Sequence, residues 1–475
     1  MLSEQIFFSS ITELAAQIRA RRISPVELTE GYLQRLEKIG ARLGAVATVM
    51  RESALKEARE AEREIRAGRY RGPLHGVPYG AKDLLATRDA KTTWGAAPYK
   101  DQRFDYDATV IKKLRAAGAV LVAKLSMIEL AGGMGYNRAD ASLTGTCRTP
   151  WNPDFWSGGS SSGPGAGVAA GLVAFAIGSE TSGSIITPAA FCGVSGFRPT
   201  YGAVSRHGAM ALCWTLDKLG PMCRNAEDCG IVLAAIAGVD PLDPTSRPLK
   251  FNAPSQRRTS RARKTATRPR VAVMKDSYDK AQPAVRENFL GALGVLKEFA
   301  SVEMDVALPD FPYSPTVGTI VDAEGASAFR ELIESGRVKE LASKQGQIGG
   351  YAASLVTAVD YLHAMRMRVP MRRAWGETFQ KYDLLVAPSR STVAYPVDKN
   401  FEEAYPGITA SSPIGASNLV GVPVISIPNG LGENNLPTGI QFIAPAWGER
   451  ALIDIAMRYQ QETDWHARRP PSPVV

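Results

Sequence analysis

Histidine is scarce in this chain of 475 residues, which contains only His75, His207, His363 and His466. None of the four stands in a motif typical of a Ser–His–Asp triad. The five cysteines are an odd number without a Cys-x-x-Cys pair or a Cys/His zinc spacing, which favours reduced thiols, and Cys192 lies in an apolar run typical of a core residue. The sequence therefore indicates no metal and no organic cofactor, and a nucleophile in this chain needs a base other than histidine.

Long apolar runs are also missing, and none reaches the length of a membrane span. The N-terminal segment lacks the basic, apolar and small-residue regions of a signal peptide. We therefore expect a cytoplasmic protein without a membrane partner.

The formal net charge is +9, and part of it comes from one stretch of the chain. No aromatic residues interleave with these charges, so we favour a solvated surface segment over a patch for nucleic acid or an acidic partner. The basic residues of this stretch are Arg257, Arg258, Arg261, Arg263, Lys264, Arg268 and Arg270.

Strands and helices are predicted to alternate along most of the chain. Hydrophobic residues make up 45% of the sequence, enough for a large core. This alternation predicts an α/β fold with one large mixed, mostly parallel twisted sheet and helices on both faces. Strands are expected within 75–85 and at 119–123, 172–177, 271–274, 384–387, 424–427 and 439–443. Helices are expected after Ser24, with Glu27 as a capping-box acid, and at 51–67, 108–117, 163–171, 284–299, 320–333, 351–380 and 450–462.

We expect residues 1–475 to form a single domain. Its parts are N-terminal helices (1–70), a catalytic core (71–230), a basic surface excursion (240–270) and a helical, substrate-facing cap (308–380). A linker between two domains at 240–270 is the alternative, but strand–helix alternation resumes directly after it.

Lys82 is the first candidate for catalysis, in the segment Gly76-Val77-Pro78-Tyr79-Gly80-Ala81-Lys82-Asp83. A buried lysine loses part of its preference for the charged form, so its pKa falls and it can act as a base. A surface Lys82 paired with Asp83 is the alternative that this segment alone leaves open.

Two segments rich in glycine and serine follow, one at Gly158–Gly165 and one at Gly178–Pro188. The first lacks the Gly-Lys-Ser/Thr end of a phosphate-binding loop. In the second, a strand runs into a small-residue turn and then a helix, so that backbone N–H groups can converge as in an oxyanion hole. Between Ser160 and Ser184 there is room for one helix and one strand, which would return the chain to the same sheet edge. Lys82 is the available base for a nucleophilic serine there.

These segments make the chain similar to the amidase-signature family. The similarity is dense from Gly76 to about Gly220, and it resumes at Tyr382–Leu385, Asn418–Pro423 and Leu436–Gln441. It implies Ser184 as nucleophile, Ser160 as bridging serine after a cis peptide bond, and Lys82 as base. It also implies an oxyanion hole from the backbone of Thr181, Ser182, Gly183 and Ser184, with Met134 of the loop Gly132-Gly133-Met134-Gly135 beside the acyl group.

Two positions depart from the family pattern. Ser182 stands where a glycine is usual, and its side chain could restrict the backbone of the turn. Ile186 stands where a basic residue is common, so a charge that helps to anchor this turn is missing.

The resemblance implies a serine hydrolase that cleaves an amide, aryl amide or carbamate (urethane) through an acyl-enzyme, with ester cleavage also open. The expected partner is a small-molecule amide or carbamate, and a homodimer is left open. The cap residues Phe311, Tyr313, Phe329, Tyr351, Leu355 and Tyr361 hint at an apolar or aromatic substrate.

Two alternatives remain. One is the glutaminase subunit of a tRNA-dependent amidotransferase, although the acid expected to bind glutamine is not seen around Thr409–Asn418. The other is a non-catalytic binding protein with the same fold.

Overall fold

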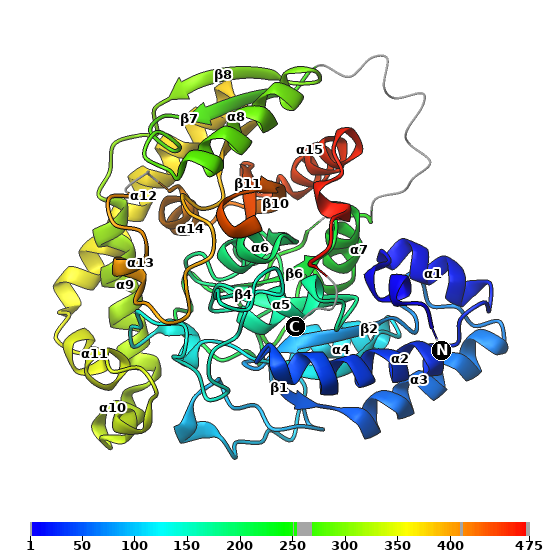
Figure 1. Ribbon diagram of the computed structural model, residues 1–475. Helices are drawn as coiled ribbons and strands as arrows, with labels where there is room; N and C mark the ends of the chain where they lie inside the picture. The colour runs from blue at the N-terminus through cyan, green and yellow to red at the C-terminus, as the bar shows by residue number, and fades with distance from the viewer. Residues whose placement is uncertain (1, 250, 254–267, 409–411, 472–475) are drawn as a thin grey trace.

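The computed structural model describes residues 2–249, 251–253, 268–408 and 412–471 (Figure 1). In these ranges one sheet of 11 strands runs through the molecule in the order β1-β3-β2-β4-β6-β5-β10-β11-β9-β7-β8. The strands are β1 (Val46–Val49), β2 (Pro78–Lys82), β3 (Val120–Leu125), β4 (Phe175–Glu180), β5 (Ser195–Arg198), β6 (Lys218–Cys223), β7 (Arg270–Met274), β8 (Ser301–Val306), β9 (Leu384–Pro388), β10 (Val424–Leu431) and β11 (Pro437–Ile443).

The predicted mixed sheet is confirmed, but the expectation that it is mostly parallel is wrong. Six of the ten strand pairings are antiparallel, and parallel pairs occur only toward the two edges, in β3-β2-β4 and β9-β7-β8. Four strands, β1, β5, β6 and β8, were not predicted. Three of the six antiparallel pairings involve two of these, β5 and β6. They lie between β4 and β10 and pair antiparallel with each neighbour.

Helices flank this sheet, and several lie close to the positions predicted from apolar periodicity. The helices Ala226–Ile236 and Ile414–Val420 were not predicted, and the single helix predicted at 351–380 is two helices. The α-helices of the described ranges are α1 (Ile11–Arg19), α2 (Pro25–Arg35), α3 (Arg51–Arg66), α4 (Thr109–Ala116), α5 (Ser162–Ala169), α6 (Ile186–Cys192), α7 (Ala226–Ile236), α8 (Pro283–Lys297), α9 (Tyr313–Ala328), α10 (Arg330–Glu334), α11 (Gly346–Ala353), α12 (Ala358–Lys381), α13 (Phe401–Ala404), α14 (Ile414–Val420) and α15 (Glu449–Glu462). In the described ranges, none of the helices is both long enough and apolar enough to cross a membrane.

The predicted crossover from β2 through α4 to β3 is present, and β2 pairs parallel with both β3 and β4. Every residue of these three strands is buried. A polar side chain at the end of β2 or β4 is therefore held in the interior, where its partners come from the protein rather than from water.

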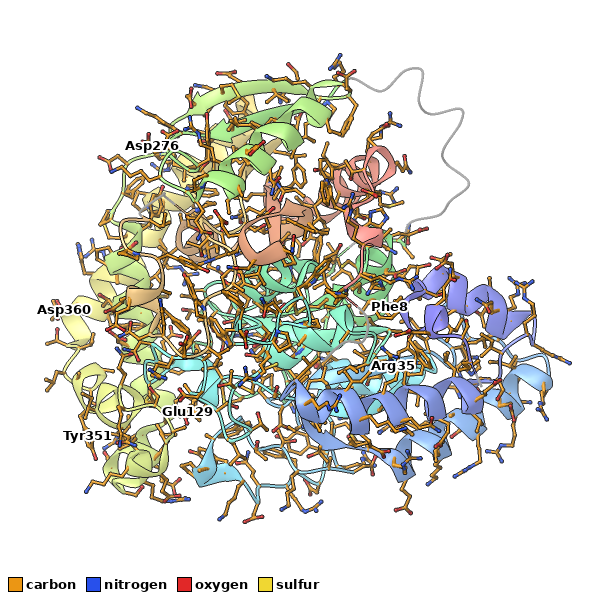
Figure 2. The ribbon with its side chains drawn as sticks, in the orientation of Figure 1. Phe8, Arg35, Glu129, Asp276, Tyr351 and Asp360 are labelled. Carbon is orange, nitrogen blue, oxygen red and sulfur yellow. The ribbon has the colours of Figure 1, made fainter. Side chains whose placement is uncertain are left out.

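Two helical layers lie at opposite sides of the molecule in Figure 1. Helices α1–α3 occupy one side, and α9–α12, which correspond to the predicted cap, stack along the other. Arg35 at the end of α2 joins the first layer to the core, because its guanidinium donates to the carbonyls of Gly171 and Ala170 at 2.8 Å and lies over the ring of Phe8 (Figure 2).

The predicted excursion at 240–270 lies partly outside the described residues, since 250 and 254–267 are not among them. Its first part packs on the core. The buried carboxylate of Asp240 accepts hydrogen bonds from Thr109 and Ser205 at 2.6 Å, and that of Asp243 accepts one from the backbone N–H of Arg206 at 2.8 Å.

Helix α2 begins as predicted at Ser24, whose hydroxyl oxygen accepts hydrogen bonds from the backbone N–H groups of Val26 (3.0 Å) and Glu27 (3.4 Å). The expected capping-box role of Glu27 is wrong. The carboxylate that binds the Ser24 hydroxyl belongs to Glu62 of α3, so the cap also ties two helices together.

We predict that Ser24→Ala lowers the free energy of unfolding by about 1 kcal/mol, because the first turn of α2 loses its side-chain acceptor. Urea denaturation followed by circular dichroism measures this change. An unchanged midpoint and slope would show that the cap contributes nothing.

Candidate active site

Lys82 is the last residue of β2, and its side chain is fully buried. Its ammonium nitrogen Nζ donates to Ser160 Oγ at 2.7 Å and to Ser179 Oγ at 2.9 Å. The alternative of a surface Lys82 paired with Asp83 is therefore wrong. Asp83 instead forms a buried ion pair with Lys124 of β3, at 3.0 Å.

Burial lowers the pKa of Lys82 to about 7, and the negative charges of Asp217 and Glu180 oppose this shift only in part. The two contacts of the ammonium group are neutral hydroxyls, which do not stabilise its charge as a carboxylate would. Near neutral pH, a substantial fraction of Lys82 is therefore uncharged and able to accept a proton.

Ser160 follows a cis peptide bond, Gly159–Ser160, as the family resemblance implies. The next residue ties this segment to two others. The backbone N–H of Ser161 donates to the carbonyl of Ser184 at 3.2 Å, and its hydroxyl donates to the carbonyl of Ser179 at 3.1 Å. The structure thus brings Lys82, the Ser160 segment, the end of β4 and the backbone of Ser184 to one place.

The turn Thr181–Ile185 joins β4 to α6 and is anchored by the fully buried Glu180. Its carboxylate accepts hydrogen bonds from the backbone N–H groups of Ile185 (2.9 Å) and Ile186 (3.0 Å). Arg198 of β5 binds the other oxygen at 2.7 Å, and Asn418 of α14 binds it at 2.9 Å. Burial raises the pKa of Glu180, but Arg198 and these donors outweigh burial and bring the pKa to about 2.

Glu180 and Arg198 were not predicted as site residues. The sequence offered one signal for them. Glu180 stands at the end of an apolar strand, and Ile186 stands at a position that is usually basic. Ile186 is buried here, and the charged anchor of the turn comes from Glu180 and Arg198 instead.

The residues of the turn leave backbone donors available. In the part of the chain that the structure describes, the N–H groups of Ser182, Gly183 and Ser184 donate to no protein acceptor. Gly183 has a φ of +96°, and a Cβ there would lie 3.2 Å from Ile414 Cγ2, so this position requires glycine. Ser182 is exposed and does not adopt a positive φ, so its side chain imposes no such conflict.

Met134 and Gly133 lie in a loop between the core and the cap. A Cβ at Gly133 would approach Leu212 Cδ1 to 2.2 Å, and one at Gly349 of α11 would approach the Met134 carbonyl to 2.0 Å. Glu129, at the start of the loop, accepts the backbone N–H groups of Ala342 (2.9 Å) and Ser343 (2.8 Å) from the cap (Figure 2). Close packing therefore fixes this loop on two sides.

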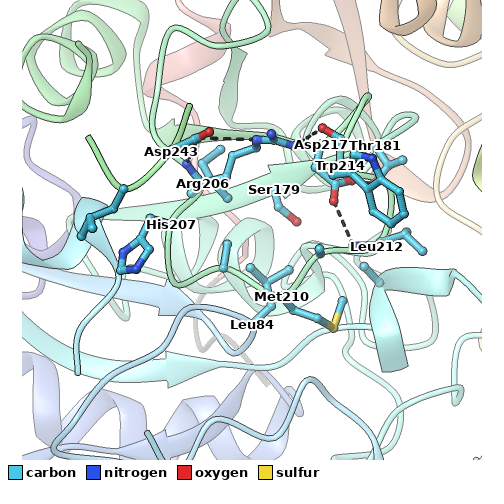
Figure 3. A pocket seen from close by; sticks show the side chains of 15 residues that line it. Leu84, Ser179, Thr181, Arg206, His207, Met210, Leu212, Trp214, Asp217 and Asp243 are labelled. Atoms are coloured by element: carbon cyan, nitrogen blue, oxygen red, sulfur yellow. Dashed lines mark hydrogen bonds and ion pairs between the residues drawn. The ribbon is translucent and has the colours of Figure 1, made fainter. Parts of the chain in front are cut away.

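A cavity of about 190 Å³ lies beside Ser179, one of the two hydrogen-bond partners of Lys82 (Figure 3). We call it the Trp214 cavity. It touches Ser179 and Thr181 rather than Ser160 and Ser184, and neither Gly133 nor Met134 lines it. The cap residues named in the sequence analysis do not line it either, and Tyr351 and Leu355 are exposed. Its lining includes Leu84, Ser179, Met210, Leu212, Trp214 and Asp217.

The carboxylate of Asp217 joins the cavity to the turn. It accepts hydrogen bonds from Thr181 Oγ1 at 2.6 Å and from the backbone N–H groups of Leu212 and Cys213 at 2.9 Å each. Burial raises the pKa of Asp217 despite these donors. Within the described ranges, no group of three or more His, Cys, Asp or Glu side chains is arranged to hold a metal ion.

Comparison with known proteins places this fold and site in a family. The Amidase family model matches residues 27–453. The chain therefore belongs to the Amidase family, the amidase-signature enzymes.

Relatives and solved structures cover nearly the whole chain. The A subunit of the glutamyl-tRNA(Gln) amidotransferase of Moorella thermoacetica is 35% identical over 98% of this chain and 99% of its own length. The native peptide amidase of Stenotrophomonas maltophilia is 30% identical, with a TM-score of 0.82 over 98% of each chain. A chain from a complex that concerns an s-triazine catabolic enzyme is 27% identical, with a TM-score of 0.86 over 96% of this chain and 98% of that one.

We predict that Glu180→Gln lowers the free energy of unfolding by about 3–5 kcal/mol, because it leaves the buried Arg198 without a counter-charge. Urea denaturation measures the loss. Glu334→Gln, which breaks the exposed Arg330–Glu334 pair, is the matched control and should cost no more than about 1 kcal/mol. Equal losses in the two variants would contradict the anchoring role of Glu180.

Proposed function

We propose that this protein hydrolyses a carbon–nitrogen amide bond through an acyl-enzyme on Ser184, with Ser160 as the bridging hydroxyl and Lys82 as the base. The observation that carries the proposal is the 2.7 Å hydrogen bond from the buried Lys82 to Ser160. Membership of the Amidase family supports the same assignment.

In the first step, neutral Lys82 accepts a proton from Ser160, and Ser160 accepts one from Ser184 as Ser184 Oγ bonds to the carbonyl carbon. The carbon–nitrogen bond then breaks, and the proton returns through Ser160 to the leaving nitrogen. Water next attacks the ester of Ser184, which releases a carboxylic acid and restores the serine. The balance is amide plus water to acid plus amine.

The negative oxygen of the tetrahedral intermediate needs donors that are already in position. The backbone N–H groups of Thr181, Ser182, Gly183 and Ser184 are the proposed oxyanion hole, and a single donor of this kind contributes about 3 kcal/mol to transition-state binding. Two observations support this assignment. In the described ranges the N–H groups of Ser182, Gly183 and Ser184 have no protein acceptor, and Glu180 anchors the turn.

The cap, residues 308–380, is proposed to face the substrate within one domain that spans the chain. This proposal is supported by a contact between the cap and the core near the site. Glu324 of α9 accepts hydrogen bonds from Thr215 Oγ1 at 2.7 Å and from Tyr361 at 2.9 Å. The same acyl chemistry would also serve a carbamate or an ester, so both belong in an activity screen.

A second candidate is the glutaminase subunit of a tRNA-dependent amidotransferase, which would act with partner subunits. The curated relatives favour it, since relatives that are 33–35% identical over at least 97% of this chain are named as the A subunit of glutamyl-tRNA(Gln) amidotransferase. The sequence argues against this candidate, because the acid expected to bind glutamine is missing around Thr409–Asn418. Of this segment, the structure describes residues 412–418. Glutamine hydrolysis that appears only with added partner subunits would select this candidate.

We predict that Ser184→Ala lowers kcat/KM at least about 1,000-fold for every amide that the wild type hydrolyses, because no nucleophile remains. The panel contains an anilide, a short aliphatic amide, glutamine and an aryl carbamate. Ser301→Ala, at an exposed position in β8, is the control and should keep wild-type rates. Full activity of Ser184→Ala would refute the mechanism.

We also predict that kcat/KM rises with pH through about 7 and then levels off, because only the neutral form of Lys82 accepts the proton and its pKa is about 7. Steady-state rates between roughly pH 5 and pH 9 measure this limb. Lys82→Arg, which stays protonated throughout, should abolish the reaction. A wild-type profile without a limb near pH 7 would contradict the assignment of Lys82 as base.

A further inference from the structure

Asp217 lies between the base and the turn that carries the nucleophile, and the mechanism above gives it no role. It stands directly before β6, the antiparallel neighbour of β4. Ser179 of β4 binds Lys82 Nζ at 2.9 Å, and Thr181 follows the end of the same strand. Ser179, Thr181 and Asp217 all line the Trp214 cavity, where Figure 3 shows Asp217 and Thr181 next to each other.

We propose that Asp217 is a positioning residue of this reaction, which holds Thr181 at the start of the oxyanion turn and stabilises with its negative charge the ammonium form of Lys82 when the base has taken up its proton. The inference rests on the proposed function, because it connects Asp217 to the relay of Lys82, Ser160 and Ser184. Within the described residues, Lys82 donates to Ser160 and Ser179 and not to Asp217 itself. Asp217 therefore acts through Thr181 and through its charge.

The hydrogen bond from Thr181 to Asp217 fixes the start of the turn. Thr181 Oγ1 donates to Asp217 Oδ1 at 2.6 Å, and Thr181 is buried. The other oxygen, Oδ2, accepts the backbone N–H groups of Leu212 and Cys213 at 2.9 Å each. The carboxylate is thus tied to the main chain by one oxygen and holds Thr181 with the other. Glu180 anchors the far end of the same turn through backbone N–H groups.

The charges around Lys82 make Asp217 its main counter-charge. Burial lowers the pKa of Lys82 to about 7, and two acids oppose this shift, Asp217 first and Glu180 second. Glu180 is paired with Arg198 at 2.7 Å, so the guanidinium offsets much of its charge. The cation that acts on Asp217 is Arg206, and its effect on the pKa of this carboxyl is smaller than that of the hydrogen bonds from Thr181 and the main chain.

The other titratable groups around the base and Asp217 do not replace it. Asp83, next to the base in the chain, is paired with Lys124 at 3.0 Å. Lys218 follows Asp217 on β6, and burial lowers the pKa of this lysine well below its usual range. Burial also raises the pKa of the Cys213 thiol, so that it stays neutral. The charge that forms at the base is therefore balanced by Asp217.

Two charges form in the first step of the reaction. Lys82 takes the proton of Ser160 as Ser160 takes that of Ser184, so an ammonium replaces a neutral amine, and a nearby carboxylate lowers its energy. The tetrahedral intermediate gains a negative oxygen, which needs the N–H groups of the turn in position. Asp217 meets the first demand with its charge and the second through Thr181. No bond to Asp217 forms or breaks, and the balance of the hydrolysis is unchanged.

Asp217→Asn tests the role of the charge. We expect the rising limb of kcat/KM near pH 7 to move to lower pH by at least about half a unit, because a lysine without this anion loses its proton more readily. The matched control is Asp240→Asn, since Asp240 is also a buried carboxylate that accepts two hydroxyls and a backbone N–H, from Thr109, Ser205 and Leu242. It should leave the limb in place. An unmoved limb in Asp217→Asn, or an equal shift in the control, would overturn the role of the charge.

Asp217→Ala gives the same test by a second route if the asparagine variant does not fold. Because Asp217 lines the cavity, water can enter and bind the donors that the carboxylate leaves. The limb should again move to lower pH, and a folded Asp217→Ala with the wild-type limb would count against the proposal as the asparagine variant does.

Thr181→Val tests the turn without removing the charge. Valine keeps the shape of threonine but cannot donate to Asp217, so we expect kcat to fall at least about tenfold while KM changes less than about threefold and the limb stays near pH 7. Thr181→Ser keeps the hydroxyl and should restore most of the rate. Equal losses in the two variants, or a loss confined to KM, would overturn the role of Thr181 and Asp217 in the turn.

Labelling of Ser184 by a fluorophosphonate needs no amide substrate and separates the two proposals. The labelling rate of the wild type should rise through about pH 7, and Asp217→Asn should move this limb to lower pH. If no amide is hydrolysed but labelling follows this pattern, amide hydrolysis fails while the role of Asp217 stands. If both proteins share one limb, the role of Asp217 fails while the proposed function stands. If Ser184 of the wild type is not labelled, the proposed function fails and the role of Asp217 falls with it.

Discussion

The burial of Lys82 without a counter-ion in contact is the constraint on which the rest of the site depends. A salt bridge to the adjacent Asp83 would hold the lysine in its charged form and remove the base. The structure prevents this by pairing Asp83 with Lys124 of β3, where Thr93 also donates to the Asp83 carboxylate. The polar partners left for Lys82 are the hydroxyls of Ser160 and Ser179, which carry no negative charge that would hold the lysine protonated.

Four carboxylates position the other parts of the site, and those of Glu180, Glu324 and Glu129 are buried. Glu180 anchors the turn that carries Ser184, Asp217 ties that turn to the segment 212–217, and Glu324 ties the same segment to the cap. Glu129 joins the loop of Met134 to the cap in the same way. Each of the four accepts backbone N–H groups, so each fixes main chain as well as side chains, as preorganised donors in a catalytic site require.

Local patterns in the sequence were enough to predict most helices, the strands around Lys82 and the glycine-rich turns. They were not enough for β1, β5, β6 and β8. Of these, β5 contains glycine and β6 contains glycine and proline, which give no clear alternation. Partners far apart in the chain were missed for a related reason. Asn418 binds Glu180 across 238 residues of sequence, and only the folded sheet brings them together. The role of the cap aromatics in substrate binding stays a prediction, because aromatic composition does not reveal which side of a helix faces the core.

Identity of 35% with amidotransferase subunits establishes the family, but a shared fold does not determine the substrate, which depends on the groups that line the site. Free glutamine carries an ammonium and a carboxylate on its acyl half, so a site that binds it must offer opposite charges on the acyl side of Ser184. At the Trp214 cavity, Arg206, Asp217 and Asp243 line the wall, and Arg206 Nε has no hydrogen-bond partner among the described residues. The walls that remain are aliphatic and aromatic. A purely apolar group would leave Arg206 Nε without a partner, so a ligand that suits this cavity combines an apolar surface with a hydrogen-bond acceptor.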